Sequence, residues 1–107
     1  MREQPTVPLK STFAHDPDMR ELVDVFVGEL PQRIESLWQA LAAQDAAGVR
    51  TMAHQLKGAA AGYGYPTIGK AAARVDEALS QAEALDKVRG SVEELLTLCR
   101  RAASTKP

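Results

Sequence analysis

The chain has few aromatic residues, a single cysteine and no long apolar stretch. Aromatic side chains make up 5% of its 107 residues, and this scarcity favours helices over sheets. Because Cys99 has no partner for an intramolecular disulfide, we expect a reducing compartment, the cytoplasm, and a buried cysteine that packs as a small hydrophobe. Since no run of about eighteen apolar residues occurs, we expect no membrane-spanning segment.

The chain also lacks a strong net charge and the common cofactor motifs. Its formal net charge is −1, which predicts no attraction to nucleic acid or to acidic lipid. No phosphate-binding glycine loop and no dinucleotide fingerprint is present, so we expect no ATP site, no autokinase activity and no cofactor of its own. No His-x-x-x-His or Cys-x-x-Cys spacing indicates a metal site. These absences are typical of one soluble carrier or binding domain covering residues 1–107.

Apolar residues recur at helical spacing in four stretches, which predicts an all-α fold, an antiparallel four-helix bundle. The first helix should begin at Asp16-Pro17, with aspartate as N-cap and proline in the first turn, and run to about Ala43. Pro31 lies inside this helix and should kink it without ending it. The positions expected to face the core are Met19, Leu22, Val23, Phe26, Leu30, Ile34, Leu37, Trp38 and Leu41.

The other three helices are predicted from caps and breaks. Asp45 should cap a helix over about 46–61, and the glycines of 62–66 should end it with left-handed backbone. Thr67 is the expected cap of the third helix, and the fourth should begin near Asp86. We expect a short helical turn or arm before the first helix, with 1–10 flexible, and a frayed tail over 104–107. The start at Met1 and the polar tail suggest a free-standing protein.

His54 is predicted to lie on the water-facing side of the second helix. The apolar stripe of that helix is formed by Val49, Ala53, Leu56, Ala60 and Tyr63. At about 100° per residue, His54 lies roughly 140° from the centre of this stripe. Residues three and four positions away are its neighbours on the helix surface, namely Arg50, Lys57, Gly58 and Ala61. The imidazole should therefore stand in water beside cationic side chains.

These neighbours indicate that His54 accepts a phosphoryl group. Glycine inside a helix costs about 1 kcal/mol relative to alanine, and clearance over the imidazole is the simplest reason for Gly58. Lys57 can stabilise the negative charge that phosphorylation brings. Arg50 either adds to the same positive field or is an ordinary solvated arginine, and Gln55 either contacts a partner or is plain surface.

These residues resemble the histidine-containing phosphotransfer (HPt) domain family of multistep phosphorelays. The family pattern His-x-x-Lys-Gly-x-x-x-x-x-Gly is matched by His54, Lys57, Gly58 and Gly64, and the preceding helix contains Glu29-Leu30-Pro31. The resemblance implies a monomeric phosphocarrier that receives phosphate within a relay headed by a sensor (hybrid) histidine kinase. It would exchange the group with an aspartate of a response-regulator receiver domain, which supplies Mg²⁺.

Some choices remain open at the level of the sequence. Some family members carry a longer polar side chain at the position of Asp76, so it is open whether this residue makes the supporting hydrogen bond. No glycine-flanked serine occurs and no pattern places a carboxylate to orient His54, which argues against serine–histidine hydrolysis. Alternatives are a receiver-binding helical adaptor that accepts no phosphate, and a purely structural bundle. Val25 and Ala61 are candidate docking residues.

Overall fold

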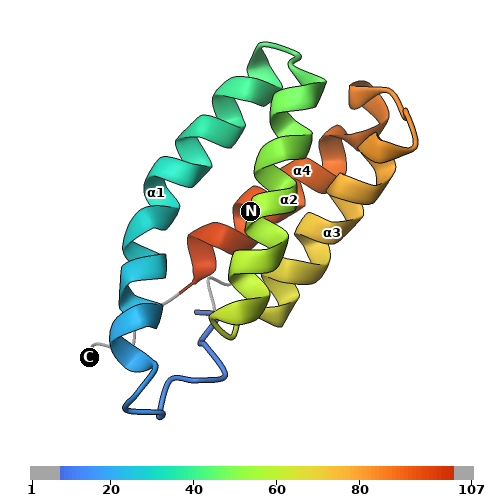
Figure 1. Cartoon of the computed structure of the whole chain (residues 1–107). Helices are drawn as coiled ribbons and strands as arrows, with labels where there is room; N and C mark the ends of the chain where they lie inside the picture. Colours follow the sequence, from blue (N-terminus) through green and yellow to red (C-terminus); the bar gives the residue numbers. More distant parts are fainter. Residues whose placement is uncertain (1–7, 103–107) are drawn as a thin grey trace, which may run out of the picture.

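Four helices form the protein in the computed structural model, which describes residues 8–102. They are α1 (Arg20–Ala42), α2 (Ala46–Gly62), α3 (Pro66–Ser80) and α4 (Leu85–Arg101). α1 packs on α2 and α4, and α3 packs on the same two helices, so the four helices close into a ring (Figure 1). The predicted antiparallel four-helix bundle is confirmed. Within 8–102 no helix is long and apolar enough to cross a membrane.

The core is built from the four apolar stripes. On α2 the stripe is buried from Val49 to Ala60, as predicted. Cys99 is only 3% exposed, which confirms its expected place in the core, and burial raises the pKa of its thiol to about 11. The Phe26 ring stacks on Tyr63, with ring centroids 5.3 Å apart. This stacking joins α1 to the end of α2.

Two large side chains that were expected in the core are exposed. Leu22 is 48% exposed and Trp38 is 45% exposed, although both belong to the long helix α1. Each is one position away from a buried residue of α1. One position corresponds to about 100° around the helix axis, so these side chains point away from the helix contacts. The prediction for Phe26 is confirmed, since this residue is 1% exposed.

The predicted helix ends are correct in part. The Asp45 carboxylate accepts a hydrogen bond from the Gly48 amide at 2.9 Å and caps α2 as expected. α1 begins at Arg20 and not at Asp16, because Asp16 first closes a turn by accepting from the Asp18 amide. Thr67 is not the cap of α3: the helix begins at Pro66, since proline lacks an amide hydrogen and suits the first helical position.

Pro31 lies within α1, and the helix continues through it to Ala42. Its interior position agrees with the prediction that the helix does not end there. The expected kink stays a prediction.

The segment before α1 is attached to the bundle. The Leu9 amide donates to the Arg101 carbonyl at 2.7 Å, and Leu9 packs against the core, so this residue of the predicted arm is attached to the bundle. A turn follows at 12–15, as expected. The Ser11 hydroxyl donates to the Tyr63 carbonyl at 2.7 Å. The rest of the predicted arm, 1–7, and the tail 104–107 lie outside the described residues.

Gly64 makes this attachment possible. Its φ is +88°, a left-handed value that confirms the predicted backbone there, whereas Gly62 ends α2 without a positive φ. The Gly64 carbonyl accepts from the Thr12 amide at 2.8 Å. A Cβ at this position would lie against Ser11 Oγ and 2.9 Å from Phe13 Cδ2. Glycine is therefore required both by the backbone angle and by the close approach of the N-terminal segment.

Replacing Gly64 with alanine should destabilise the fold. We expect the free energy of unfolding, measured by urea denaturation, to fall by at least about 1 kcal/mol, because alanine is strained at positive φ and would push away the N-terminal segment. Gly90→Ala is the matched control: a Cβ there meets nothing within 4 Å in the middle of α4. It should raise stability by up to about 1 kcal/mol. Equal effects of the two changes would contradict this account.

Candidate functional site

His54 stands on the outer side of α2, as its phase predicts. Its side chain is 67% exposed, so the prediction that the imidazole faces water is confirmed. Arg50 and Lys57 lie one turn before and about one turn after it, and their side chains are 53% and 41% exposed. All three side chains turn toward α3. There they contact a residue whose role the sequence analysis left open.

That residue is Asp76 of α3, whose side chain is only 10% exposed. Its Oδ2 lies 2.9 Å from His54 Nδ1 and accepts a hydrogen bond from Lys57 Nζ at 3.2 Å. Its Oδ1 accepts from Arg50 Nε at 3.3 Å. A carboxylate therefore does orient His54, and the expectation that none is placed to do so is wrong. The open question about Asp76 is also answered, since this shorter side chain does reach the imidazole.

The ionisation of Asp76 determines which imidazole nitrogen of His54 carries the hydrogen. The hydrogen bond from His54, followed by those from Lys57 and Arg50, lowers the pKa of Asp76 to about 2, although burial acts in the raising direction. An ionised carboxylate can only accept hydrogen bonds. His54 Nδ1 must therefore carry the hydrogen in this contact. In the neutral ring, Nε2 is left with its lone pair on the far side of a largely exposed side chain.

Small residues explain how so short a side chain spans the two helices. Gly69 of α3 is buried, and a Cβ there would lie 3.5 Å from the Lys57 carbonyl oxygen and 3.5 Å from the Ala61 amide nitrogen. Ala53 and Ala72 are fully buried in the core. Small side chains let helix backbones approach closely, so the carboxylate needs no longer stem. The sequence feature that could have revealed Asp76 as a buried residue is its place four residues after Ala72, in phase with an otherwise apolar stripe.

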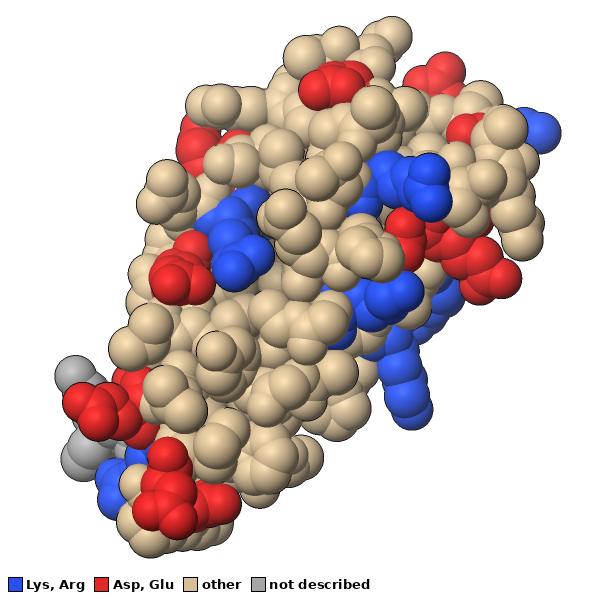
Figure 2. Space-filling model, viewed as in Figure 1, with Lys and Arg blue, Asp and Glu red and all other residues tan. Residues whose placement is uncertain are grey.

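The surface over Gly58 is open. Gly58 is exposed, and a Cβ built on it meets nothing within 4 Å. Ala61 and Gln55 are also exposed on α2, and Val25 of α1 is 56% exposed. In Figure 2 charged side chains of both signs gather where α2 meets α3, whereas the surface over the lower part of α2 is largely uncharged. His54 thus has a strongly charged side toward α3 and a less charged side toward α1.

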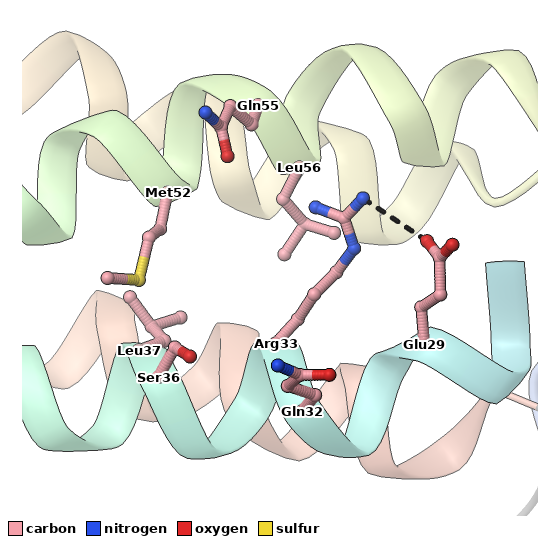
Figure 3. A pocket seen from close by; sticks show the side chains of 8 residues that line it. All are labelled: Glu29, Gln32, Arg33, Ser36, Leu37, Met52, Gln55 and Leu56. Carbon is pink, nitrogen blue, oxygen red and sulfur yellow. Dashed lines mark hydrogen bonds and ion pairs between the residues drawn. The ribbon is translucent and has the colours of Figure 1, made fainter.

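A groove of about 400 Å³ lies between α1 and α2, on the side of His54 that faces α1. Figure 3 shows Met52, Leu56 and Leu37 at its apolar walls and polar side chains at its rim. The Arg33 guanidinium lies across it and pairs with Glu29 at 3.4 Å, while Arg33 Nε is buried without a hydrogen-bond partner. Gln55 lines this groove and also the shallow hollow that contains His54. The groove is therefore continuous with the surroundings of the imidazole.

Comparison with known families agrees with this geometry. A family model described as the Hpt domain matches residues 21–105. The chain belongs to the Hpt-domain family. Hpt domains are phosphocarriers of histidine phosphotransfer in two-component phosphorelays, where they interact with response regulators and kinases. Searches of curated proteins and of solved structures found no significant match. Among residues 8–102 of this Hpt domain, no group of three or more histidine, cysteine or acidic side chains is arranged to hold a metal ion.

The lowered pKa of Asp76 predicts a pH-dependent contribution to stability. A carboxylate whose pKa is depressed by folding stabilises the protein above its unfolded pKa, and this contribution is lost as the pH falls through the folded value. For Asp76 the window runs from the ordinary value of 3.8 down to about 2. Asp76→Asn should therefore lower the free energy of unfolding near neutral pH, and the difference from wild type should shrink through this window.

Urea denaturation of both proteins across this pH range measures the effect. Glu77→Gln is the matched control, because Glu77 is the next residue of α3, is exposed, and its side chain forms no hydrogen bond or ion pair with α2 within residues 8–102. It should differ little from wild type at any pH. A difference between Asp76→Asn and wild type that stays constant down to about pH 2 would contradict the assignment of the ion pairs to Asp76.

Proposed function

We propose that this Hpt domain carries a phosphoryl group on Nε2 of His54 and exchanges it with an aspartate of a receiver domain. The observation that carries the proposal is the imidazole itself, 67% exposed and held through Nδ1 by a carboxylate. Lys57 and Arg50 provide positive charge within the same cluster. Phosphoryl transfer requires chiefly positioning and charge stabilisation, and the cluster supplies both.

The transfer step is a displacement at phosphorus. The lone pair of His54 Nε2 attacks the phosphorus of the receiver's aspartyl phosphate, and an N–P bond forms while the P–O bond to the aspartate breaks. The aspartate leaves as a carboxylate. The ring becomes an imidazolium whose proton on Nδ1 already faces Asp76, so no proton has to move. The reverse step releases the neutral imidazole again.

The receiver would supply the Mg²⁺ that neutralises charge at its own acidic pocket. The chain would contribute the nucleophile and Lys57, with Arg50 as a second cation. Because an acceptor of this kind needs a donor, we place the domain between a sensor (hybrid) histidine kinase and a response regulator. We expect it to act in the cytoplasm as a monomer.

The groove beside His54 supports a docking role for the face formed by α1 and α2. A receiver that covers the imidazole must also cover Gln55, whose side chain lies between His54 and the groove. Val25 and Ala61 add exposed apolar surface on the two helices. Apolar contacts here would hold the receiver without competing for the cations needed by the phosphoryl group.

Replacing His54 with glutamine should abolish phosphate acceptance and leave the fold intact. The test uses receiver domains labelled with a radioactive acyl phosphate, in the presence of Mg²⁺, and follows label that is lost in acid and kept in base. His15→Gln is the control, because it removes the only other histidine and lies exposed before α1. Acid-labile label on the His54→Gln protein would overturn the assignment. A wild-type chain that binds the phosphorylated receiver but takes no label would instead be an adaptor.

Replacing Gly58 with glutamine should slow transfer without unfolding the domain. The longer side chain would stand beside the imidazole and obstruct the receiver, and we expect a loss of about ten- to a hundredfold in rate. Gly90→Gln introduces the same side chain on α4, also at an exposed glycine with open space around it. It should transfer at the wild-type rate. Equal rates for the two variants would mean that clearance is not the reason for Gly58.

A further inference from the structure

Arg33 lies across the groove between α1 and α2 and takes no part in the transfer step (Figure 3). We propose that Arg33 is a specificity-determining residue: its guanidinium binds an acidic side chain of the receiver in this groove, and Glu29 pairs with that guanidinium only until the receiver docks. This inference rests on the proposed function, because it names what the docking face beside His54 recognises.

The first argument concerns the incomplete pairing of the guanidinium. Arg33 Nη2 contacts Glu29 Oε1 at 3.4 Å, a long contact between two partly exposed side chains one helical turn apart. Arg33 Nε is buried and has no hydrogen-bond partner among residues 8–102. The N–H groups of Nε and Nη2 point to the same side of the planar group, and a carboxylate can bind both at once. Glu29 therefore occupies half of this edge, and the buried half remains unpaired at a cost in desolvation.

The second argument concerns the surroundings of Arg33. Glu29 is the one acidic residue among those that line the groove, and its walls are the apolar side chains of Leu37, Met52 and Leu56. An ion pair that forms against apolar walls and away from water is stronger than the same pair on an open surface. The groove is therefore suited to a partner segment that presents a carboxylate beside an apolar side chain.

The third argument identifies the receiver as the source of that carboxylate. Gln55 lines both the groove and the hollow that contains His54, so a receiver placed over the imidazole also reaches the groove. The Arg33 side chain is 34% exposed, and its flexible stem allows the guanidinium to turn toward the incoming carboxylate. That carboxylate would replace Glu29 and pair with both donors of the edge.

The same geometry would reject other receivers. A receiver with a neutral or basic side chain at this point would cover Arg33 without pairing it, and an unpaired charge in an interface is costly. Arg33 would thus select among receivers by one charge, while the chemistry at His54 stays the same for all of them.

The test measures how tightly receiver domains bind the chain. A panel of fluorescently labelled receiver domains with Mg²⁺ is screened by anisotropy, and the receiver that binds the wild-type chain most tightly is used for the variants. Arg33→Gln should weaken binding at least about tenfold. Glu29→Gln should tighten it about three- to tenfold, because Arg33 loses its competing partner. A pair that only stabilised the fold would not give effects of opposite sign.

Two controls separate this effect from general electrostatics. In an Arg33→Gln background, Glu29→Gln should no longer tighten binding, because no guanidinium is left to release. Glu35→Gln removes one negative charge from an exposed position of α1 that does not line the groove, and it should change the affinity by less than about twofold. Circular dichroism should report the same helix content for every variant.

The outcomes distinguish this inference from the proposed function. Effects of equal sign, a tightening by Glu29→Gln that persists without Arg33, or a panel without any bound receiver would overturn the role of Arg33. A wild-type dimer that Arg33→Gln dissociates, measured by analytical ultracentrifugation, would assign the groove to a second copy of the chain and would overturn it too. A chain that shows the expected binding pattern but takes no phosphate would refute the proposed function and leave the role of Arg33 standing.

Discussion

The hydrogen bond between Asp76 Oδ2 and His54 Nδ1 determines what the rest of the site can do. This contact is 2.9 Å long and joins α3 to α2 through a carboxylate that is mostly buried. An isolated carboxylate in that position would be costly, and the cost is offset because Lys57 and Arg50 complete its ion pairs. Lys57 and Arg50 are held by the same carboxylate that orients the imidazole, so His54 and its positively charged neighbours depend on one residue.

This arrangement depends in turn on how closely α2 and α3 pack. Gly69 allows the backbone of α3 to approach the carbonyl of Lys57, and seven residues later, two turns along the helix, Asp76 comes within reach of His54. Larger side chains at the buried alanines would separate the helices and break a contact that a short side chain cannot follow. The abundance of alanine therefore has a consequence beyond helix propensity, because it sets the interhelical distance that the site requires.

Sequence reasoning could predict the parts of this arrangement that belong to one helix. The exposure of His54, its neighbours Arg50 and Lys57, and the buried stripe of α2 all follow from helical periodicity. The partner on α3 could not be found in this way, since Asp76 is 22 residues from His54 and periodicity contains no information about which helices pack together. The prediction that Trp38 is buried was wrong for a related reason. This residue lies at the edge of the apolar stripe of α1, where burial depends on the neighbouring helices.

In the proposed transfer, the side of His54 toward α3 would stabilise the phosphoryl charge, and the side toward α1 would recognise the receiver. Toward α3 lie Lys57 and Arg50, held by Asp76. The interaction of these two cations with a dianionic group would be strong and would depend little on the identity of its carrier. Toward α1 lie Gln55 and a groove with apolar walls, where shape decides which surface fits. A carrier that exchanges one chemical group with chosen partners needs both properties at once. Placing them on opposite sides of one exposed side chain allows the partner-selecting surface to vary while the charged cluster stays unchanged.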